Sequence, residues 1–248
     1  MPFLTNFTRR LNTAASYIEN PQLFDIRQRG GVPNTFLQLN QPWLHALDIA
    51  TILDIGANVG QFSTVINTIF PKANIYAFEP LPDCFQKLKL RMAGCEKFTG
   101  LNFGLGDQSG SLMFERNAYS PSSSFLEIAD AHKEAFPKTR NTETVEVKIE
   151  RLDTLVKDLF ITSPLLVKID VQGYEYQVLC GGEQTIKNAR LVITETSFVS
   201  LYKNQRLFDD VYRILTNWGF VYAGSVDQLY NPKDGQILQA DSIFIKPL

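Results

Sequence analysis

The sequence predicts an α/β protein built on a doubly wound parallel sheet, and three observations predict it. From residue 51 onward, short apolar runs alternate with segments whose apolar residues recur at helical spacing. Glycine or proline stands at the turns between them. The run 164–170 (PLLVKID) is almost continuously apolar, as in a central parallel strand covered on both faces. Such a β-α-β-α-β order requires a parallel sheet with crossover helices.

The first 50 residues show no strand alternation and predict helices. Residues 8–20 form a helix that ends before Pro21, Gly30–Pro33 breaks the segment, and residues 34–48 form one helix or a helix pair. We therefore divide the chain into a helical N-terminal extension, 1–50, and a main domain, 51–248. The extension either covers one side of the sheet or forms a lid or a wall of the substrate site.

The first half of the main domain contains three predicted strands and two predicted helices. The glycine at the end of the first strand, Pro71 after the first helix and Gly94 after the second mark the boundaries. The predicted order is strand 51–55, helix 61–70, strand 74–80, helix 84–94 and strand 97–107.

The second half continues the pattern after two extended segments, 110–117 and 143–149, which flank a Ser/Pro-rich loop and predict an inserted hairpin or edge strands. The last two strands are separated by too few residues for a helical crossover, so we expect them to pair antiparallel. The predicted order is strand 164–170, helix 174–182, strand 189–196, amphipathic helix 206–220, and strands 220–226 and 240–248.

Composition and charge argue against nucleic-acid and membrane partners. The formal charge is -2, from 24 basic and 26 acidic residues, so there is no basic footprint for nucleic acid. No window approaches the roughly 18 apolar residues of a membrane span, which predicts no membrane partner. Cys84, Cys95 and Cys180 are scattered, so we interpret them as reduced thiols and predict a cytoplasmic protein. The oligomeric state is not determined by the sequence.

The first strand-to-helix turn, LDIGANVGQFS (53–63), is the first candidate binding segment. Gly56 and Gly60 let the backbone approach a ligand, and the helix N-terminus offers free N–H groups. The spacing is not the G-x-G-x-x-G of dinucleotide sites, and Asp54 would repel a pyrophosphate but suits a cationic group. The alternative is that the glycines only make the turn and Asp54 caps the helix.

Glu79 favours the binding interpretation. It ends the second strand, 25 residues after Asp54, where doubly wound folds place an acid that accepts hydrogen bonds from ribose hydroxyls. The run Gly104–Asp107 ends the third strand, where small residues would let a flat base lie against the backbone and Asp107 could accept from an exocyclic amine. The sequence therefore predicts an adenosine-type ligand at this edge of the sheet.

Seven segments, in order, resemble the FkbM family of S-adenosylmethionine-dependent methyltransferases: LDIGANVGQFS, AFEP, GLGDQSG, RLDTL, LVKIDVQGYEYQVLCGG, VITETSFVSLY and QADSIFI. The resemblance covers about residues 51–245, and KIDVQGYE is its most specific block. It implies a class I methyltransferase (Rossmann-like) sheet of seven strands with the last antiparallel. It also implies S-adenosyl-L-methionine as cofactor and O-methylation of a hydroxyl on a sugar, polyketide or other secondary metabolite.

Site residues follow from the resemblance together with the strand ends. Asp54, Gly56, Asn58 and Gly60 match the family's first motif, and Asp170 and Glu175 match its fourth-strand motif. The cofactor-binding set that we expect is Asp54, Gly56, Asn58, Gly60, Phe62, Glu79, Pro80, Leu105, Gly106, Asp107 and Asp170.

Methyl transfer to an alcohol requires removal of the hydroxyl proton, and Asp170, at the end of the central strand, is the first candidate for a general base or orienting carboxylate. Lys168 points to the same face and needs a partner among Asp54, Asp170 and Glu195, in a structural or a substrate-binding role. With Glu175, these residues form the predicted catalytic set of Asp170, Lys168 and Glu175. Asp170, Glu175 and Glu195 could converge on Mg²⁺, but we assign no metal site.

The remaining polar candidates are weaker. Ser122–Ser124 could contact the cofactor carboxylate or the acceptor, and His45 or His132 could act as a base. The tyrosines near the motifs, Tyr174, Tyr176 and Tyr202, are expected to pack in the core. Two other classes stay open at this point: a cofactor-binding module without chemistry, and an NAD-dependent oxidoreductase, which the glycine spacing disfavours.

Overall fold

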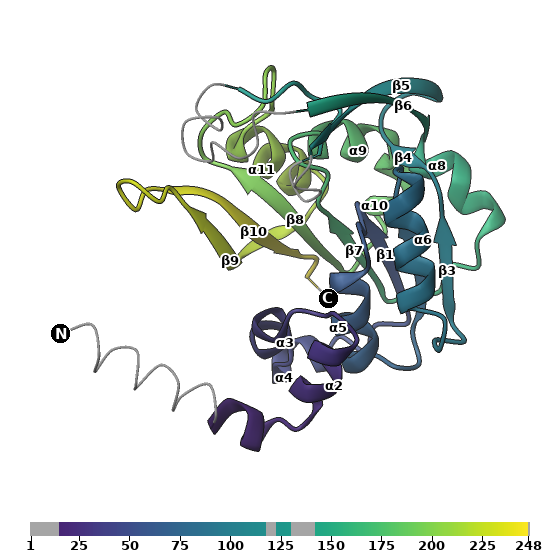
Figure 1. Ribbon diagram of the computed structural model, residues 1–248, viewed down its shortest axis with the longest axis vertical. Helices are drawn as coiled ribbons and strands as arrows, with labels where there is room; N and C mark the ends of the chain where they lie inside the picture. The colour runs from purple at the N-terminus through teal and green to yellow at the C-terminus, as the bar shows by residue number, and fades with distance from the viewer. Residues whose placement is uncertain (1–14, 118–122, 130–141, 248) are drawn as a thin grey trace.

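The computed structural model describes residues 15–117, 123–129 and 142–247. Its centre is a seven-stranded sheet in the order β3-β2-β1-β7-β8-β10-β9 (Figure 1). Pairing is parallel among the first five strands, whereas β10 runs antiparallel to both β8 and β9. The predicted fold class, including the antiparallel last strand, is therefore confirmed. The strands are β1 Thr51–Ile55, β2 Asn74–Phe78, β3 Phe98–Leu101, β7 Leu165–Ile169, β8 Leu191–Ser197, β9 Val221–Tyr230 and β10 Ile237–Ile245.

Helices cover both faces of the sheet because the central strands are apolar on both faces. Along β1, Ile52 packs into the core on one face, while Leu53 and Ile55 pack into the core on the other. The first face is covered by α5 (Gln61–Ile69) and α6 (Pro82–Arg91). The second is covered by α8 Leu152–Leu155, α9 Glu175–Gly181, α10 Glu183–Ile186 and α11 Phe208–Asn217, with the 3₁₀ turn η3 Val156–Asp158 after α8.

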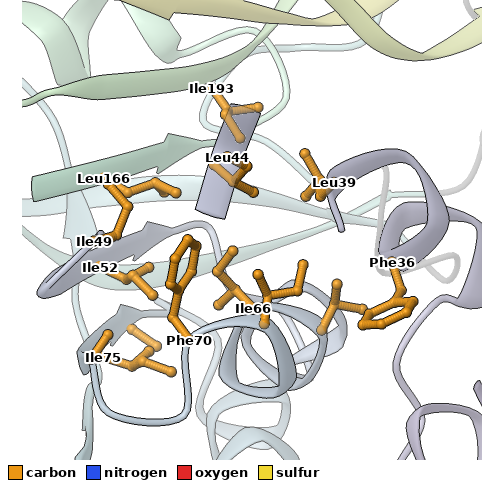
Figure 2. Packing of buried hydrophobic residues seen from close by; sticks show 14 of the residues in the cluster. Phe36, Leu39, Leu44, Ile49, Ile52, Ile66, Phe70, Ile75, Leu166 and Ile193 are labelled. Atoms are coloured by element: carbon orange, nitrogen blue, oxygen red, sulfur yellow. The ribbon is translucent and has the colours of Figure 1, made fainter. Parts of the chain in front are cut away.

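The described part of the N-terminal segment is helical, as predicted. Residues 34–48 form a helix pair, α3 (Pro33–Leu39) and α4 (Pro42–His45), each with proline in its first turn. A further helix, α2 (Gln22–Gln28), was not predicted. Figure 2 shows Phe36, Leu39 and Leu44 lying among side chains of the main domain such as Ile66 and Ile193. Burying each such side chain contributes roughly 1.5–3 kcal/mol, so these helices belong to the core of the protein.

The prediction of one strand over 97–107 is wrong in its second half. The chain leaves the main sheet after Leu101, where the Asn102 side-chain amide donates to the carbonyls of Glu79 and Pro80 at 2.7 and 2.9 Å. These side-chain bonds replace strand pairing at that point. Gly104–Leu105 then forms β4 in a second sheet.

The second sheet has the order β4-β6-β5 and contains the predicted inserted hairpin, β5 (Gly110–Asn117) and β6 (Thr142–Glu150). The two long strands pair antiparallel, and β4 adds to β6 in parallel. Figure 1 shows this sheet above the carboxyl ends of the central strands. Its residues Gly104, Leu105 and Phe114 face the cavity described next.

Candidate active site

A cavity of about 440 Å³ lies at the carboxyl ends of β1, β2 and β7. Ligands of doubly wound sheets bind at this edge, where the strand order reverses. The β1 turn, the end of β2 and the segment after β7 form three of its walls. The other walls come from α3, the second sheet and the β9–β10 hairpin. Segments distant in the sequence therefore meet at one site.

The two glycines of the β1 turn are explained by packing. Gly56 has φ +81°, and a Cβ there would lie 1.9 Å from the backbone oxygen of Asp170. Gly60 caps α5 with φ +89°, and its Cβ would meet Leu88 at 2.8 Å. Both positions therefore require glycine whether or not a ligand approaches. The case for binding rests on the cavity and on the carboxylates around it.

Asp54, in β1, is buried and lines the cavity. Its Oδ2 accepts a hydrogen bond of 2.5 Å from the Ser63 hydroxyl on α5. The pKa of Asp54 is raised to about 6, chiefly by burial and in part by the nearby Asp170, against the opposing effects of Ser63 and Lys168. A cationic group entering the cavity would stabilise the ionised form.

Glu79, directly after β2, connects the turn after β1 with the turn after β2 through hydrogen bonds. Its Oε2 accepts from the backbone N–H of Asn58 and its Oε1 from that of Leu81, both at 2.9 Å. Burial raises the pKa of Glu79 to about 7 despite these two bonds. Each oxygen retains a lone pair, so the carboxylate can also accept from two ligand hydroxyls.

Lys168 and Asp170 point to the same face of β7, as predicted. The buried Lys168 Nζ lies 3.4 Å from Asp170 Oδ2 and 3.1 Å from Asp241 Oδ1 on β10. Asp170 was an expected partner, whereas Asp241 was missed. Burial lowers the pKa of Lys168, but Asp170, Asp241 and Glu195 together outweigh it and raise the pKa above the usual value. Lys168 therefore stays an ammonium ion.

Glu175 and Glu195 occupy different environments. Glu175 Oε1 accepts from the backbone N–H of Val171 and Gly173 at 3.0 and 3.1 Å, so this carboxylate supports the turn after β7 from behind the cavity wall. Burial raises its pKa to about 7. Glu195 accepts from the amides of Gln172 and Gln239 at 2.9–3.0 Å. Within the described ranges, no group of three or more His, Cys, Asp or Glu residues is arranged to hold a metal ion.

The other predicted residues divide into two groups. Gly60, Gly106 and Asp107 are not among the residues that line the cavity. Gly106 is enclosed between Ile149 and Tyr174, and Asp107 is exposed, with its carbonyl accepting from Arg151. The predicted residues that do line the cavity are Asp54, Gly56, Asn58, Phe62, Glu79, Pro80, Leu105, Lys168 and Asp170.

Of the Ser122–Ser124 loop, Ser123 lines the cavity and Ser124 Oγ donates to the backbone carbonyl of Gln172 at 2.6 Å. Ser122 and His132 lie outside the described residues. His45 is hydrogen-bonded to Asn40, lies next to the Phe70 ring and is not among the residues that line the cavity.

Five polar or wall-forming residues of the cavity were not predicted: Val32 just before α3, Thr35 on α3, Gln172 after β7, Asp227 on β9 and Asp241 on β10. Gln172 stood inside a quoted motif, and its polar side chain next to Asp170 was the available signal. Asp241 also stood inside a quoted motif, QADSIFI. Val32, Thr35 and Asp227 gave no signal, because only the packing of the N-terminal helices and the hairpin brings them to the cavity.

The charged residues that line the cavity favour a cationic ligand. Its lining contains five carboxylates, those of Asp54, Glu79, Asp170, Asp227 and Asp241, against the single ammonium of Lys168. A ligand with a net positive charge, such as S-adenosylmethionine with its sulfonium and amino groups, fits this lining. A pyrophosphate would meet repulsion.

The family model described as the methyltransferase FkbM domain matches residues 54–222, from the cavity end of β1 into β9. The chain belongs to the FkbM methyltransferase family. The matched region contains the β1 turn, Glu79 and the whole β7–α9 segment. The resemblance inferred from the motifs is thus confirmed.

Two curated relatives of this FkbM-family chain are distant. The 2-O-methyltransferase NoeI of Sinorhizobium fredii is 26% identical over 62% of the chain and 66% of the relative. The hexuronic acid methyltransferase AglP of Haloferax volcanii is 30% identical over 57% and 54%. The chain thus matches about half to two thirds of the length of these relatives. The chain also matches a crystal structure of methyltransferase FkbM from Methylobacillus flagellatus KT at 13% identity, with a TM-score of 0.49. The match covers 93% of this chain and 60% of the chain in the crystal structure.

The part of the chain that the structure describes contains no helix long and apolar enough to cross a membrane.

Proposed function

We propose that this protein is an S-adenosylmethionine-dependent O-methyltransferase that acts on a hydroxyl of a small molecule, a sugar or a glycosylated metabolite. The observation that carries the proposal is the carboxylate-lined cavity at the carboxyl ends of β1, β2 and β7 in a chain of the FkbM family. Such a cavity suits a cationic nucleoside.

Asp54 and Glu79 divide the recognition of the cofactor between them. Glu79 accepts from the ribose hydroxyls, since it ends β2 and keeps a free lone pair on each oxygen. Asp54 and the β1 turn hold the amino-acid end. Bound in this way, S-adenosylmethionine supplies an electrophilic methyl group on a sulfonium.

Asp170 is the proposed general base. Its side chain is 38% exposed, so an acceptor hydroxyl can reach it from the cavity. The Lys168 ammonium lies 3.4 Å from Asp170 Oδ2, so this oxygen is held in place before the hydroxyl arrives. As the acceptor oxygen bonds to the methyl carbon and the carbon–sulfur bond breaks, Asp170 takes the hydroxyl proton. No step requires a metal ion.

The acceptor class is proposed from the family and from the walls of the cavity. The name of AglP specifies a hexuronic acid, and that of NoeI specifies transfer to a 2-oxygen. Val32 just before α3, Thr35 on α3 and Asp227 on the hairpin add a wall that can contact an acceptor. The N-terminal segment would then serve as part of the substrate wall as well as cover for the core.

Calorimetry with S-adenosylhomocysteine and NAD⁺ side by side tests the proposal. Binding of S-adenosylhomocysteine without a response to NAD⁺ supports it, and the reverse result overturns it. A screen of neutral sugars, amino sugars and uronic acids with labelled S-adenosylmethionine then tests chemistry. Cofactor binding without a methylated product across the screen would favour a binding module.

A further inference from the structure

Three non-glycine residues with left-handed backbone line the cavity: Asn58 at φ +50°, Gln172 at +54° and Asp227 at +47°. Asparagine and aspartate tolerate this conformation because their short polar side chains bond locally. Glutamine has no such advantage. Strained residues of this kind cluster at functional sites, so the conformation of Gln172 needs a reason in its contacts.

The Gln172 side chain bridges two carboxylates from neighbouring strands. Its Nε2 donates to Asp170 Oδ1 at 2.9 Å and lies 3.0 Å from both oxygens of Glu195. A primary amide carries two N–H donors, and here one serves each carboxylate. The left-handed turn places the amide between Asp170, which follows β7, and Glu195, in β8.

Tyr202 sets which end of the amide faces the carboxylates. Its hydroxyl, on a fully buried ring, donates to Gln172 Oε1 at 2.9 Å. Burial raises the pKa of Tyr202 well above its usual value, so the hydroxyl keeps its proton. A donor on the oxygen side leaves the nitrogen side for Asp170 and Glu195. Sequence reasoning assigned Tyr202 to core packing only.

We infer that Gln172 is a positioning residue for methyl transfer: oriented by Tyr202, it holds the Asp170 carboxylate in place and separates it from Glu195. The inference rests on the proposed function and on Asp170 as its base. With Lys168 on Oδ2 and Gln172 on Oδ1, both oxygens of Asp170 are held by a donor. The carboxylate therefore has one orientation toward the cavity.

Removing the amide changes how Asp170 binds its proton. The charged groups around Asp170 are Asp54 on β1, Lys168 on β7, Glu175 on α9, Glu195 on β8 and Asp241 on β10. Without Gln172, the carboxylates of Asp170 and Glu195 face each other with no donor between them. Asp170 Oδ1 then loses its donor, and the loss of a donor to a carboxylate disfavours the charged form of that carboxylate.

Gln172→Gly is the direct test, because glycine accepts φ +54° and the backbone is left unstrained. We expect the acidic limb of the pH profile of kcat/KM to move to higher pH by about one unit. The loss of activity should be about tenfold on the acidic limb of the profile and smaller at its alkaline end. Affinity for S-adenosylhomocysteine should not change.

Asp48→Gly is the matched control. It removes a side chain from another left-handed position, φ +47°, just before β1 and therefore at the opposite end of that strand from the cavity. Tyr202→Phe provides a second variant, which keeps Gln172 but releases its amide, and should shift the acidic limb in the same direction by less. Carbon-13 NMR of labelled aspartate carboxyls in wild type and Gln172→Gly reads the titration of Asp170 without turnover.

An equal loss at every pH, or an Asp170 titration that is the same with and without the amide, overturns the positioning role. If the wild-type protein methylates no acceptor, the proposed function fails, but the NMR titration still decides the role of Gln172. The two failures are therefore distinguishable.

Discussion

Glu79→Gln tests the proposed ribose contact and the local structure together. Both oxygens of the buried Glu79 accept backbone N–H groups at 2.9 Å, from Asn58 and Leu81. Glutamine keeps one acceptor and turns a donor toward the other N–H. An orphaned buried donor costs roughly 1–3 kcal/mol, so we expect the free energy of unfolding to fall by that amount.

Glu79→Gln is expected to weaken ligand binding more than most substitutions at the surface do. Two hydroxyls that lose a charged acceptor forfeit roughly 1.5–3 kcal/mol, or about 10- to 150-fold in affinity for S-adenosylhomocysteine. The measurement is calorimetry at pH 8, above the pKa of about 7, with urea unfolding in parallel. At pH 5.5 wild-type Glu79 is protonated, so the difference in affinity should shrink.

Glu96→Gln is the matched control, since it makes the same charge change on an exposed turn before β3. It should leave both affinity and stability unchanged. Equal affinity of wild type and Glu79→Gln at pH 8 would refute the assignment of Glu79 to the ribose.

Three further outcomes are expected. Asp170→Asn should lower kcat by about 10²- to 10⁴-fold with unchanged affinity for S-adenosylhomocysteine, measured by methyl transfer and calorimetry. Lys168→Met should lower the free energy of unfolding by roughly 3–5 kcal/mol in urea, because it leaves buried carboxylates unpaired, and adding Asp241→Leu should recover part of the loss. Stability without ligand should fall as the pH rises from about 4 to 7, since the pKa values of Asp54 and Glu79 are raised from 3.8 and 4.5 to about 6 and 7 in the folded state.

Each of these has a result that would contradict it. Unchanged turnover of Asp170→Asn removes that residue as the base. A fully stable Lys168→Met would mean that water, not the protein, solvates the partner carboxylates. For the pH dependence the sign is the test: a folded state that holds protons more tightly than the unfolded chain must lose stability as they dissociate.

The fold could be predicted because its signals are local. The alternation of strands and helices predicted the doubly wound parallel sheet, and the short link before the last strand predicted its antiparallel pairing. The number of seven strands was implied by the family resemblance. The boundary errors arose where a non-local contact decides. The 97–107 run divides because Asn102 bonds to the loop after β2 and because Gly104–Leu105 pairs with Ile149 and Glu150 of β6, over 40 positions later.

Three acids of the candidate site were predicted from their place near the end of a strand. Asp54, Glu79 and Asp170 follow from position in the β1, β2 and β7 segments, since parallel strands bring their carboxyl ends to one edge. Asp241 lies in β10, whose antiparallel direction brings a mid-strand residue to Lys168. The ion pair between Asp241 and Lys168 depends on the order of the strands in the sheet, and neighbouring residues in the sequence do not determine that order.

The sequence alone determined the class of fold, the family and the acids at the ends of the strands, because periodicity, turn glycines and motif spacing are properties of neighbouring residues. Tertiary structure alone decided which charges meet. It paired Lys168 with Asp241, placed Gln172 between Asp170 and Glu195, and turned Glu175 to the backbone behind the cavity. Electrostatic and hydrogen-bond partners are set by distances of a few ångströms across strands, and only the packed sheet sets those distances.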